Sequence, residues 1–242
     1  MKNYFFITGT GKGIGKALTE ILLKDKQNFV YGLSRANEIE SANFQFVKID
    51  LSDNPAIENY TFPVLEDVQS ITLINNAGVI GDIKPIGKKN NASITETITV
   101  NTTAPIVLIN SFITTYQEQN IEKLILNISS GAGRHPIHSW ADYCASKSAV
   151  DMLSETIKFE QTFFKEENRV KIFSVAPGVV DTEMQVQIRN TSKDDFSNVE
   201  RFISLNENKE LSSPKFVAEK LLHILSNSDK FNDVILDIRN IS

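Results

Sequence analysis

The chain of 242 residues contains one cysteine and three histidines. A lone Cys144 excludes an internal disulfide, and three histidines without a paired spacing argue against a metal site. No basic run offsets the formal charge of −5, which argues against a general nucleic-acid binder. No apolar stretch approaches a membrane-spanning length, and the opening apolar run is too short for an export signal. The sequence therefore predicts a cytoplasmic protein without metal, membrane or nucleic-acid partners.

Short apolar runs rich in β-forming residues alternate with longer helical patterns along the chain. The predicted strands are residues 4–8, 29–33, 44–49, 71–75, 123–128, 170–176 and 234–237, and the predicted helices lie near 13–24, 101–119, 141–165 and 214–226. This β-α-β order predicts a seven-stranded, largely parallel sheet in a single doubly wound, Rossmann-like α/β domain covering residues 1–242. A polar stretch at 182–213, after the sixth strand, is expected to form a substrate-covering flap.

A glycine-rich turn follows the first predicted strand and leads into an amphipathic segment. Glycines permit a tight turn and a close approach of the backbone to a pyrophosphate at the positive end of a helix. The alternative is a purely structural turn, because Ile14 occupies a place where the pattern G-x-G-x-x-G needs glycine. The expected cofactor-binding residues of this turn are Gly9, Gly11, Lys12, Gly13, Ile14 and Gly15.

The second predicted strand is followed by Ser34 and Arg35, where an enzyme that prefers NAD would usually carry an acid. Arg35 and Lys12 instead offer positive charge to a 2′-phosphate, for which a guanidinium is well shaped. These residues predict NADPH in preference to NADH. The alternative is that both cations are solvated surface residues.

Tyr143 and Lys147 are four positions apart on a predicted helix, and Ser130 lies thirteen positions before Tyr143. Four residues make about one helical turn, so the phenol and the ammonium project from the same face. A nearby positive charge lowers the pKa of a phenol and makes it a usable proton donor and acceptor. Taken alone the pair also fits two exposed helix residues, and the accompanying motifs favour catalysis.

The chain resembles the short-chain dehydrogenase/reductase family over nearly its whole length. The resemblance is carried by the glycine turn, Asn75-Asn76-Ala77-Gly78, Asn101, Ser130, Tyr143, Lys147 and Pro177-Gly178. Three further segments are similar to the branch that contains sepiapterin reductase and bacterial benzil reductase. They are residues 127–133, 140–144 and 176–185.

The resemblance implies a role for each of four catalytic residues. Ser130 would bind the substrate carbonyl oxygen, and Tyr143 would give that oxygen its proton as hydride arrives from the nicotinamide. Lys147 would lower the pKa of the phenol and hold the nicotinamide ribose. Asn101 would kink its helix and carry a water to Lys147, although a helix N-cap before Thr102 is an alternative.

The family pattern also supplies further cofactor contacts, which alone would be ordinary turn residues. They are Asp50 and Leu51 at the adenine, Asn76, Ala77 and Gly78 behind the ribose, and Pro177, Val179 and Thr182 near the nicotinamide amide. Trp140 is a candidate wall of the substrate pocket, with packing against its own loop as the alternative. Asp237 resembles the aspartate that anchors a pterin, and a plain strand-terminal acid is the other interpretation.

These features together predict an NADPH-dependent reductase of a ketone or vicinal dicarbonyl, either an aryl diketone such as benzil or a pterin side chain as in sepiapterin. Two alternatives are a non-catalytic NADP(H)-sensing protein of the same fold and an NADP-dependent secondary alcohol dehydrogenase. The helix at 141–165 carries more apolar bulk than one sheet contact requires, and the family commonly associates through this helix. A homodimer or homotetramer is therefore expected.

Overall fold

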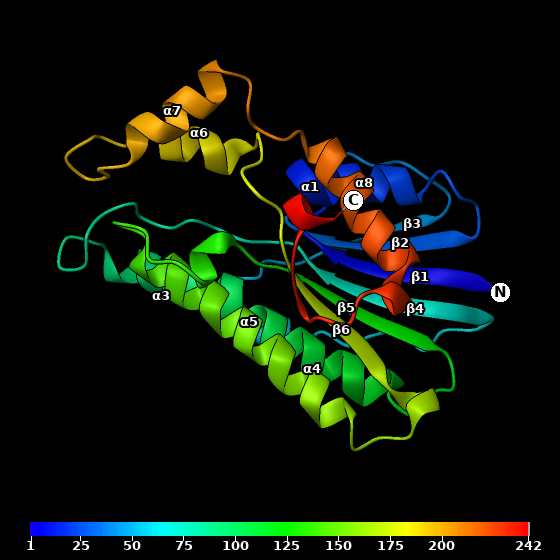
Figure 1. Cartoon of the computed structure of the whole chain (residues 1–242). Helices are drawn as coiled ribbons and strands as arrows, with labels where there is room; N and C mark the ends of the chain where they lie inside the picture. The colour runs from blue at the N-terminus through cyan, green and yellow to red at the C-terminus, as the bar shows by residue number, and fades with distance from the viewer. Residues whose placement is uncertain (242) are drawn as a thin grey trace.

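The computed structural model describes residues 1–241, and an α/β fold is built on one seven-stranded sheet (Figure 1). Every strand pair is parallel, in the order β3-β2-β1-β4-β5-β6-β7. The strands are β1 (Lys2–Thr8), β2 (Asn28–Ser34), β3 (Phe44–Lys48), β4 (Val68–Asn75), β5 (Glu122–Ile128), β6 (Val170–Ala176) and β7 (Ile235–Asp237). The predicted Rossmann-like class is confirmed, and each predicted strand is present.

Helices cover both faces of the sheet, as parallel sheets with apolar strands require. On one face lie α1 (Gly13–Leu22) and α8 (Pro214–Ser226), and on the other lie α2 (Asn54–Glu58), α4 (Ala104–Tyr116) and α5 (Ala141–Gln161) (Figure 1). The first core joins Leu18 of α1 to Leu221 of α8, and the second places Phe112 of α4 against Phe6 of β1. The two cores hold the strands in place, and with them the carboxyl ends that carry the predicted site residues.

One helical stretch is longer than the sequence analysis predicted. Helix α3 (Asn91–Ile98) passes through a π-helical segment, η1 (Thr99–Thr103), directly into α4. The extra length arises because the Asn90 side chain accepts a hydrogen bond from the amide of Ala92 and caps α3. By length and hydropathy the stretch Asn91–Tyr116 passes as a membrane span, but half of its apolar window is buried, as in the core helix of a globular domain.

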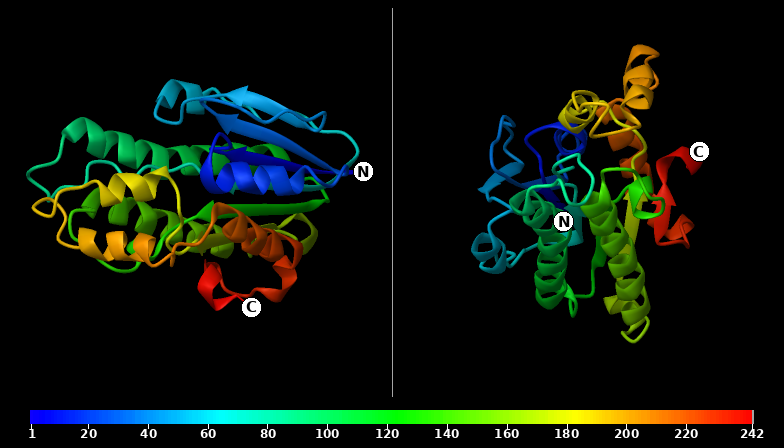
Figure 2. Two further views of the ribbon diagram at one scale, coloured as in Figure 1. Left: turned by 90° about the horizontal axis from the view of Figure 1, so that it is seen from above. Right: turned by 90° about the vertical axis from the view of Figure 1, so that its left-hand side faces the viewer.

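The strand order reverses between β1 and β4, the position at the carboxyl ends of the strands where open parallel sheets have their ligand-binding crevice. The polar stretch after β6 contains two helices, α6 (Glu183–Arg189) and α7 (Val199–Glu207). Both lie beyond the sheet, at the end away from the N-terminus (Figure 2, left, yellow and orange). The segment expected to be a flap is thus at the same end of the molecule as the crevice.

Candidate active site

The glycine turn after β1 is clamped to the end of β4 by Asn76. The Nδ2 of Asn76 donates to the carbonyl oxygens of Thr8 at 2.9 Å and Gly9 at 3.2 Å, while the Thr8 hydroxyl accepts from the amides of Asn76 and Ala77 at 2.9 and 3.0 Å. A Cβ at Gly15 would lie 2.3 Å from the Gly9 carbonyl oxygen. The turn is therefore fixed by bonds from the Asn76 and Thr8 side chains to the main chain, and a side chain at position 15 has no room.

The residues of this turn fit a bound dinucleotide. Helix α1 starts at Gly13, its N-cap Lys12 contributes no side-chain cap, and its first turn contains no acid. The first amides of a helix have no intrahelical partner and carry partial positive charge, which suits an anionic pyrophosphate. Gly78 lies opposite, where an added Cβ would be 3.6 Å from the Nζ of Lys147. The backbone at Gly78 therefore comes close to the Lys147 ammonium.

At the adenosine end, β2 stops at the buried Ser34 and continues into the exposed Arg35. The carboxylate of Asp50 accepts from the amide and the hydroxyl of Ser52 at 2.9 and 2.8 Å. These bonds lower the pKa of Asp50, and the charge of Arg35 adds to the effect. Leu51 is buried behind Asp50. Arg35 and Asp50 thus lie at the same end of the site, as expected.

The Lys12 ammonium does not stand alone in the structure. It pairs with the carboxylate of Glu183 at the start of α6, and both side chains are largely exposed. The sequence analysis assigned Lys12 to a 2′-phosphate and did not foresee this partner. The pair connects the glycine turn to the flap.

The structure brings Ser130, Tyr143 and Lys147 together at the carboxyl end of β5. Ser130 caps a short 3-10 turn, η2 (Gly131–Gly133), and its hydroxyl is close enough to the Tyr143 phenol to lower the pKa of that group. Tyr143 and Lys147 lie one turn apart on α5, with the Nζ of Lys147 5.8 Å from the centre of the phenol ring. The same Nζ donates to the carbonyl oxygen of Ile128 at 2.8 Å. A substrate carbonyl bound at Ser130 would therefore lie next to the hydroxyl of Tyr143.

Burial shifts the pKa values of both Tyr143 and Lys147. It raises the pKa of Tyr143 to about 12, and the nearby Ser130 hydroxyl offsets this only in part. It lowers the pKa of Lys147 to about 8, against the opposing charge of Asp151. Desolvation is the largest influence on the phenol of Tyr143. The lowering of its pKa by Lys147 together with an oxidised nicotinamide stays a prediction. Near neutral pH the phenol carries its proton and the lysine carries its charge.

Asn101 lies inside the π-helical segment η1, so the alternative interpretation as an N-cap is wrong. Its Oδ1 accepts from the amide of Val79 at 2.9 Å, and its Nδ2 donates to the Val79 carbonyl at 2.8 Å and the Ser146 hydroxyl at 3.1 Å. A π turn is a common departure from regular helix at functional sites. The side chain therefore holds the segment after β4 against α5.

Trp140 joins the catalytic helix to the flap. Its ring packs edge-on against Tyr143 at 5.7 Å and stacks on Phe196 at 5.4 Å, with Phe202 at 5.5 Å. The pocket-wall and packing interpretations of Trp140 are thus compatible. Sequence reasoning missed Phe196 and Phe202, and two aromatics in an otherwise polar stretch were the available signal.

The loop between β4 and α3 is a second element that the sequence did not reveal. The Nε2 of Gln187 in α6 donates to the carbonyl oxygen of Gly81 in this loop at 3.0 Å. The Nζ of Lys89 binds the carboxylate of Asp142 at 2.6 Å, and both side chains are at most 2 % exposed. Asp142 directly precedes Tyr143. This buried pair fixes the loop to the start of the catalytic helix.

The segment after β6 runs from Pro177 to Thr182, the residue before α6. Val179 packs in the cluster that contains Tyr143 and Trp140. These placements agree with a loop beside the nicotinamide.

Asp237, at the end of β7, is held by Arg239. Its two carboxylate oxygens accept from the Nε and Nη2 of Arg239 at 2.8 and 2.6 Å. This bond is the largest cause of the lowered pKa of Asp237. Arg239 also approaches Gly178, next to the expected nicotinamide segment. The geometry favours a strand-terminal acid over a free pterin anchor.

Four buried side-chain atoms among residues 1–241 have no hydrogen-bond partner, and all of them lie at the carboxyl edge of the sheet. They are Asn75 Oδ1, Ser129 Oγ, Trp140 Nε1 and Asp142 Oδ2. Buried polar atoms are usually paired, and exceptions gather at functional sites. Their position supports ligand binding at this edge.

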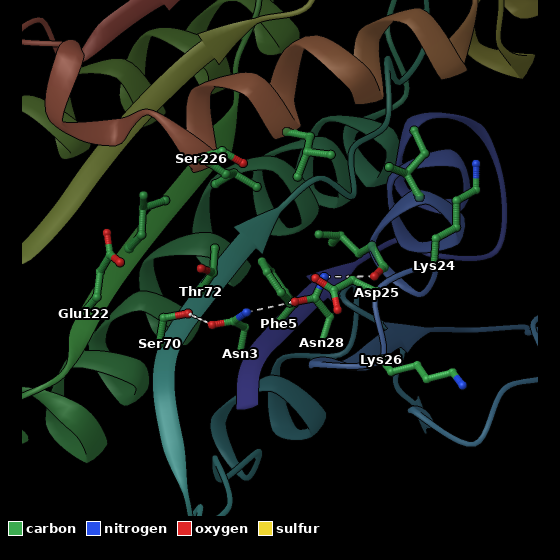
Figure 3. Close-up of a pocket in the computed structure, with 15 residues that line it drawn as sticks. Asn3, Phe5, Lys24, Asp25, Lys26, Asn28, Ser70, Thr72, Glu122 and Ser226 are labelled. Atoms are coloured by element: carbon green, nitrogen blue, oxygen red, sulfur yellow. Dashed lines mark hydrogen bonds between the residues drawn. The ribbon is translucent and has the colours of Figure 1, made fainter. Parts of the chain in front are cut away.

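A cavity of about 860 Å³ opens at the opposite, amino-terminal edge of the sheet, between the ends of α1 and α8 (Figure 3). Its polar side chains already bind one another, since Asn3 donates to Asn28 at 3.0 Å and Ser70 donates to Asn3 at 2.9 Å. None of the expected site residues lines it. The cavity is therefore separate from the catalytic group.

The chain belongs to the short chain dehydrogenase family, whose model matches residues 3–193. It is an oxidoreductase of the class that uses a nicotinamide cofactor on small molecules. A benzil reductase that forms (S)-benzoin in Bacillus cereus is 36% identical over 238 residues, which are 93% of this chain and 95% of that protein. The benzil reductase of Bacillus subtilis (strain 168) is 37% identical over 241 residues, covering 97% and 98%.

The predicted branch is supported by a third relative, and the fold by two solved structures. Sepiapterin reductase of Bos taurus is 28% identical over 248 residues, covering 93% of this chain and 90% of that protein. A short chain dehydrogenase/reductase from Saccharomyces cerevisiae has a TM-score of 0.81 at 23% identity, covering 100% and 97%. A 4-hydroxyisoleucine dehydrogenase complexed with NADH has a TM-score of 0.78 at 23% identity, covering 98% and 96%, and these two show the fold alone.

Proposed function

We propose that this protein is an NADPH-dependent reductase of vicinal dicarbonyl compounds, with an aryl diketone such as benzil as its substrate class. The observation that carries the proposal is the meeting of Ser130, Tyr143 and Lys147 beside the glycine turn. The similarity to two benzil reductases over nearly the whole chain supports the substrate class. The cofactor supplies a hydride to the carbonyl carbon.

The protein side chains supply the proton and the orientation. Ser130 donates to the carbonyl oxygen and places it against the Tyr143 phenol, which transfers its proton to that oxygen. A pKa of about 12 keeps Tyr143 protonated at neutral pH, and this state is the one that reduction needs. The charge of Lys147 then stabilises the phenolate left on Tyr143. Asn101 keeps the Val79 peptide and α5 in place around these groups.

An aryl diketone fits the site better than a pterin. The carboxylate of Asp237 is occupied by Arg239 and would have to leave it to bind an amino-pyrimidine. Trp140 and Phe196, which are buried and stacked on each other, give the side of the site next to Tyr143 an apolar backing that suits an aryl substrate. If Asp237→Asn left sepiapterin turnover unchanged, this assignment would gain support; a large loss would favour a pterin substrate.

The central experiment is an NADPH-consumption screen with benzil, 1-phenyl-1,2-propanedione, sepiapterin and simple ketones, run beside Tyr143→Phe. We expect benzil turnover, and a kcat about 10²- to 10⁴-fold lower in Tyr143→Phe because the proton donor is lost. Tyr4→Phe, which changes a phenol far along β1 from the site, is the matched control. Full turnover by Tyr143→Phe would overturn the mechanism.

Other outcomes of this screen separate the remaining candidates. Tight NADPH binding with no turnover of any carbonyl compound would favour a non-catalytic sensor. Efficient oxidation of secondary alcohols with NADP⁺ and weak reduction would favour an alcohol dehydrogenase.

The preference for NADPH over NADH is tested by substitution of Arg35, which directly follows β2. The exposed Arg35 provides a cation for the 2′-phosphate, so Arg35→Asp is expected to raise the KM for NADPH about tenfold or more and to lower that for NADH. The control is Arg35→Lys, which keeps the positive charge but loses the forked guanidinium. An unchanged preference in Arg35→Asp would contradict the assignment.

The proposal includes a cytoplasmic, single-domain protein that acts as a homo-oligomer, with residues 182–213 as its flap. The surface of α5 and of the turn after it supports association, because Met152, Phe159 and Phe163 are 66%, 64% and 77% exposed. Ile106 of α4 adds a further exposed apolar side chain. Light scattering of the purified protein separates a dimer or tetramer from a monomer.

A further inference from the structure

Asp151 lies in the catalytic helix two turns after Tyr143, and the proposed mechanism gives it no role. Residues four apart on a helix share a face, so Tyr143, Lys147 and Asp151 form one stripe along α5. Asp151 is 9% exposed and Lys147 is 4% exposed. A buried carboxylate one helical turn from a buried ammonium calls for an explanation, because both groups lose hydration.

The carboxylate of Asp151 is fixed from two other elements. Its Oδ1 accepts from the hydroxyl of Ser174 in β6 at 2.6 Å, and its Oδ2 accepts from the Nε of Arg134, just after η2, at 3.1 Å. Arg134 is also hydrogen bonded to the carbonyl of Leu236 in β7. The carboxylate therefore has a set orientation between the sheet and the catalytic helix.

The buried ammonium of Lys147 has few other groups to stabilise it. Its hydrogen-bond acceptor among residues 1–241 is the neutral carbonyl of Ile128, at 2.8 Å. Tyr143 faces it with a neutral phenol, and Asn101 on η1 carries no charge. Asp151 raises the pKa of Lys147, against the larger lowering caused by burial. It is the anion positioned to keep the lysine charged.

We propose that Asp151 is a positioning residue whose carboxylate, held by Ser174 and Arg134, keeps Lys147 in its ammonium form. The catalytic consequence rests on the proposed function, in which that ammonium stabilises the Tyr143 phenolate. Other charged groups also face Asp151 and its partners Ser174 and Arg134. Arg134 opposes the carboxylate, and on β7 and the following turn Asp237 and Arg239 face Arg134 as an ion pair.

The first test measures Lys147 directly in the protein without cofactor. Proteins with ¹³C-labelled lysine are titrated by NMR, and the Lys147 signal is assigned with Lys147→Met. We expect Asp151→Asn, which keeps hydrogen-bonding oxygen but loses the charge, to lower the titration midpoint by about one pH unit. Asp151→Glu is expected to restore most of the shift, and Ser174→Ala, which removes no charge, to leave the midpoint nearly unchanged.

The second test follows the pH dependence of kcat/KM for benzil reduction. Loss of the Lys147 proton inactivates the enzyme in this scheme, so the activity falls as pH rises through about 8. Asp151→Asn lowers the pKa of Lys147 further, so the activity is lost at a lower pH. At pH values below this loss, kcat and KM change little. A purely structural role would lower activity at all pH values without moving the fall.

The two readouts separate the inference from the function. An unchanged Lys147 midpoint in Asp151→Asn overturns the inference, whatever the activity does. A lowered midpoint with an unmoved activity profile supports the inference and contradicts the proposed role of Lys147. If Asp151→Asn does not fold, Asp151→Ser, which is smaller and also uncharged, gives the same readout.

Discussion

The nucleotide end and the substrate end of the site are held by different kinds of contact. At the nucleotide end, the glycine turn is fixed by hydrogen bonds of the Asn76 and Thr8 side chains to main-chain atoms, with no room for a side chain at position 15. At the substrate end, the loop after β4 and the flap are fixed by side chains, through the buried Lys89–Asp142 pair and the stacked rings of Trp140 and Phe196. Where side chains bind the main chain and glycine is required, few amino-acid substitutions are tolerated. Where side chains bind one another, both partners can be replaced, so the substrate pocket can vary while the cofactor site stays the same.

The largest effect is expected at the substrate end, in Lys89→Met. This change leaves the Asp142 carboxylate buried without its ion partner, which costs about 3–5 kcal/mol of unfolding free energy. Urea denaturation of the purified variant measures the loss. The double variant Lys89→Met/Asp142→Leu removes both charges and is expected to recover much of the stability. Equal losses in the single and double variants would show that packing, not the charge pair, fixes the loop.

A smaller effect, confined to the nucleotide end, is expected from Gly15→Ala. The new Cβ would lie 2.3 Å from the Gly9 carbonyl oxygen, so the turn must move, at a cost of about 1–3 kcal/mol. NADPH binding, followed by cofactor fluorescence, should weaken about tenfold or more. Gly131→Ala is the control, because its Cβ would meet no atom within 4 Å. Unchanged affinity in Gly15→Ala would refute this account of the nucleotide end.

The smallest effect is expected where the two ends meet, in Glu183→Gln. Its ion pair with Lys12 is exposed, and such pairs contribute little to stability. Releasing Lys12 from the carboxylate should tighten NADPH binding by about twofold or less, with the midpoint of urea denaturation unchanged. Lys193→Gln, at another exposed pair, is the control. Weaker NADPH binding in Glu183→Gln would mean that the pair orders the cofactor site.

The sequence predicted the sheet because buried parallel strands are continuous apolar runs, as in β5 and β6. The glycine turn and the Tyr143–Lys147 spacing were also visible, since each depends on local geometry. The pairing of Lys89 with Asp142 was not, because 53 positions separate the two residues and no local pattern links them. The raised pKa of Tyr143 was missed for a related reason: burial is set by tertiary packing.

The ends of the long helix were missed because the π segment interrupts the period on which helix prediction depends. Regular amphipathic spacing resumes only in α4, so the residues before Asn101 lacked a helical pattern. Arg239 shows a different limit of prediction from sequence. Its spacing of two from Asp237 carried no signal, yet it decides what that carboxylate binds.

The π segment Thr99–Thr103 also sets the rotational phase of α4. A π turn accommodates one more residue than a regular turn, and one residue corresponds to about 100° of rotation. Removing a single residue from this segment would let the helix run on without interruption but would turn Leu108 and Phe112 away from the sheet. A feature that looks local to Asn101 therefore keeps the whole following helix in register with the core.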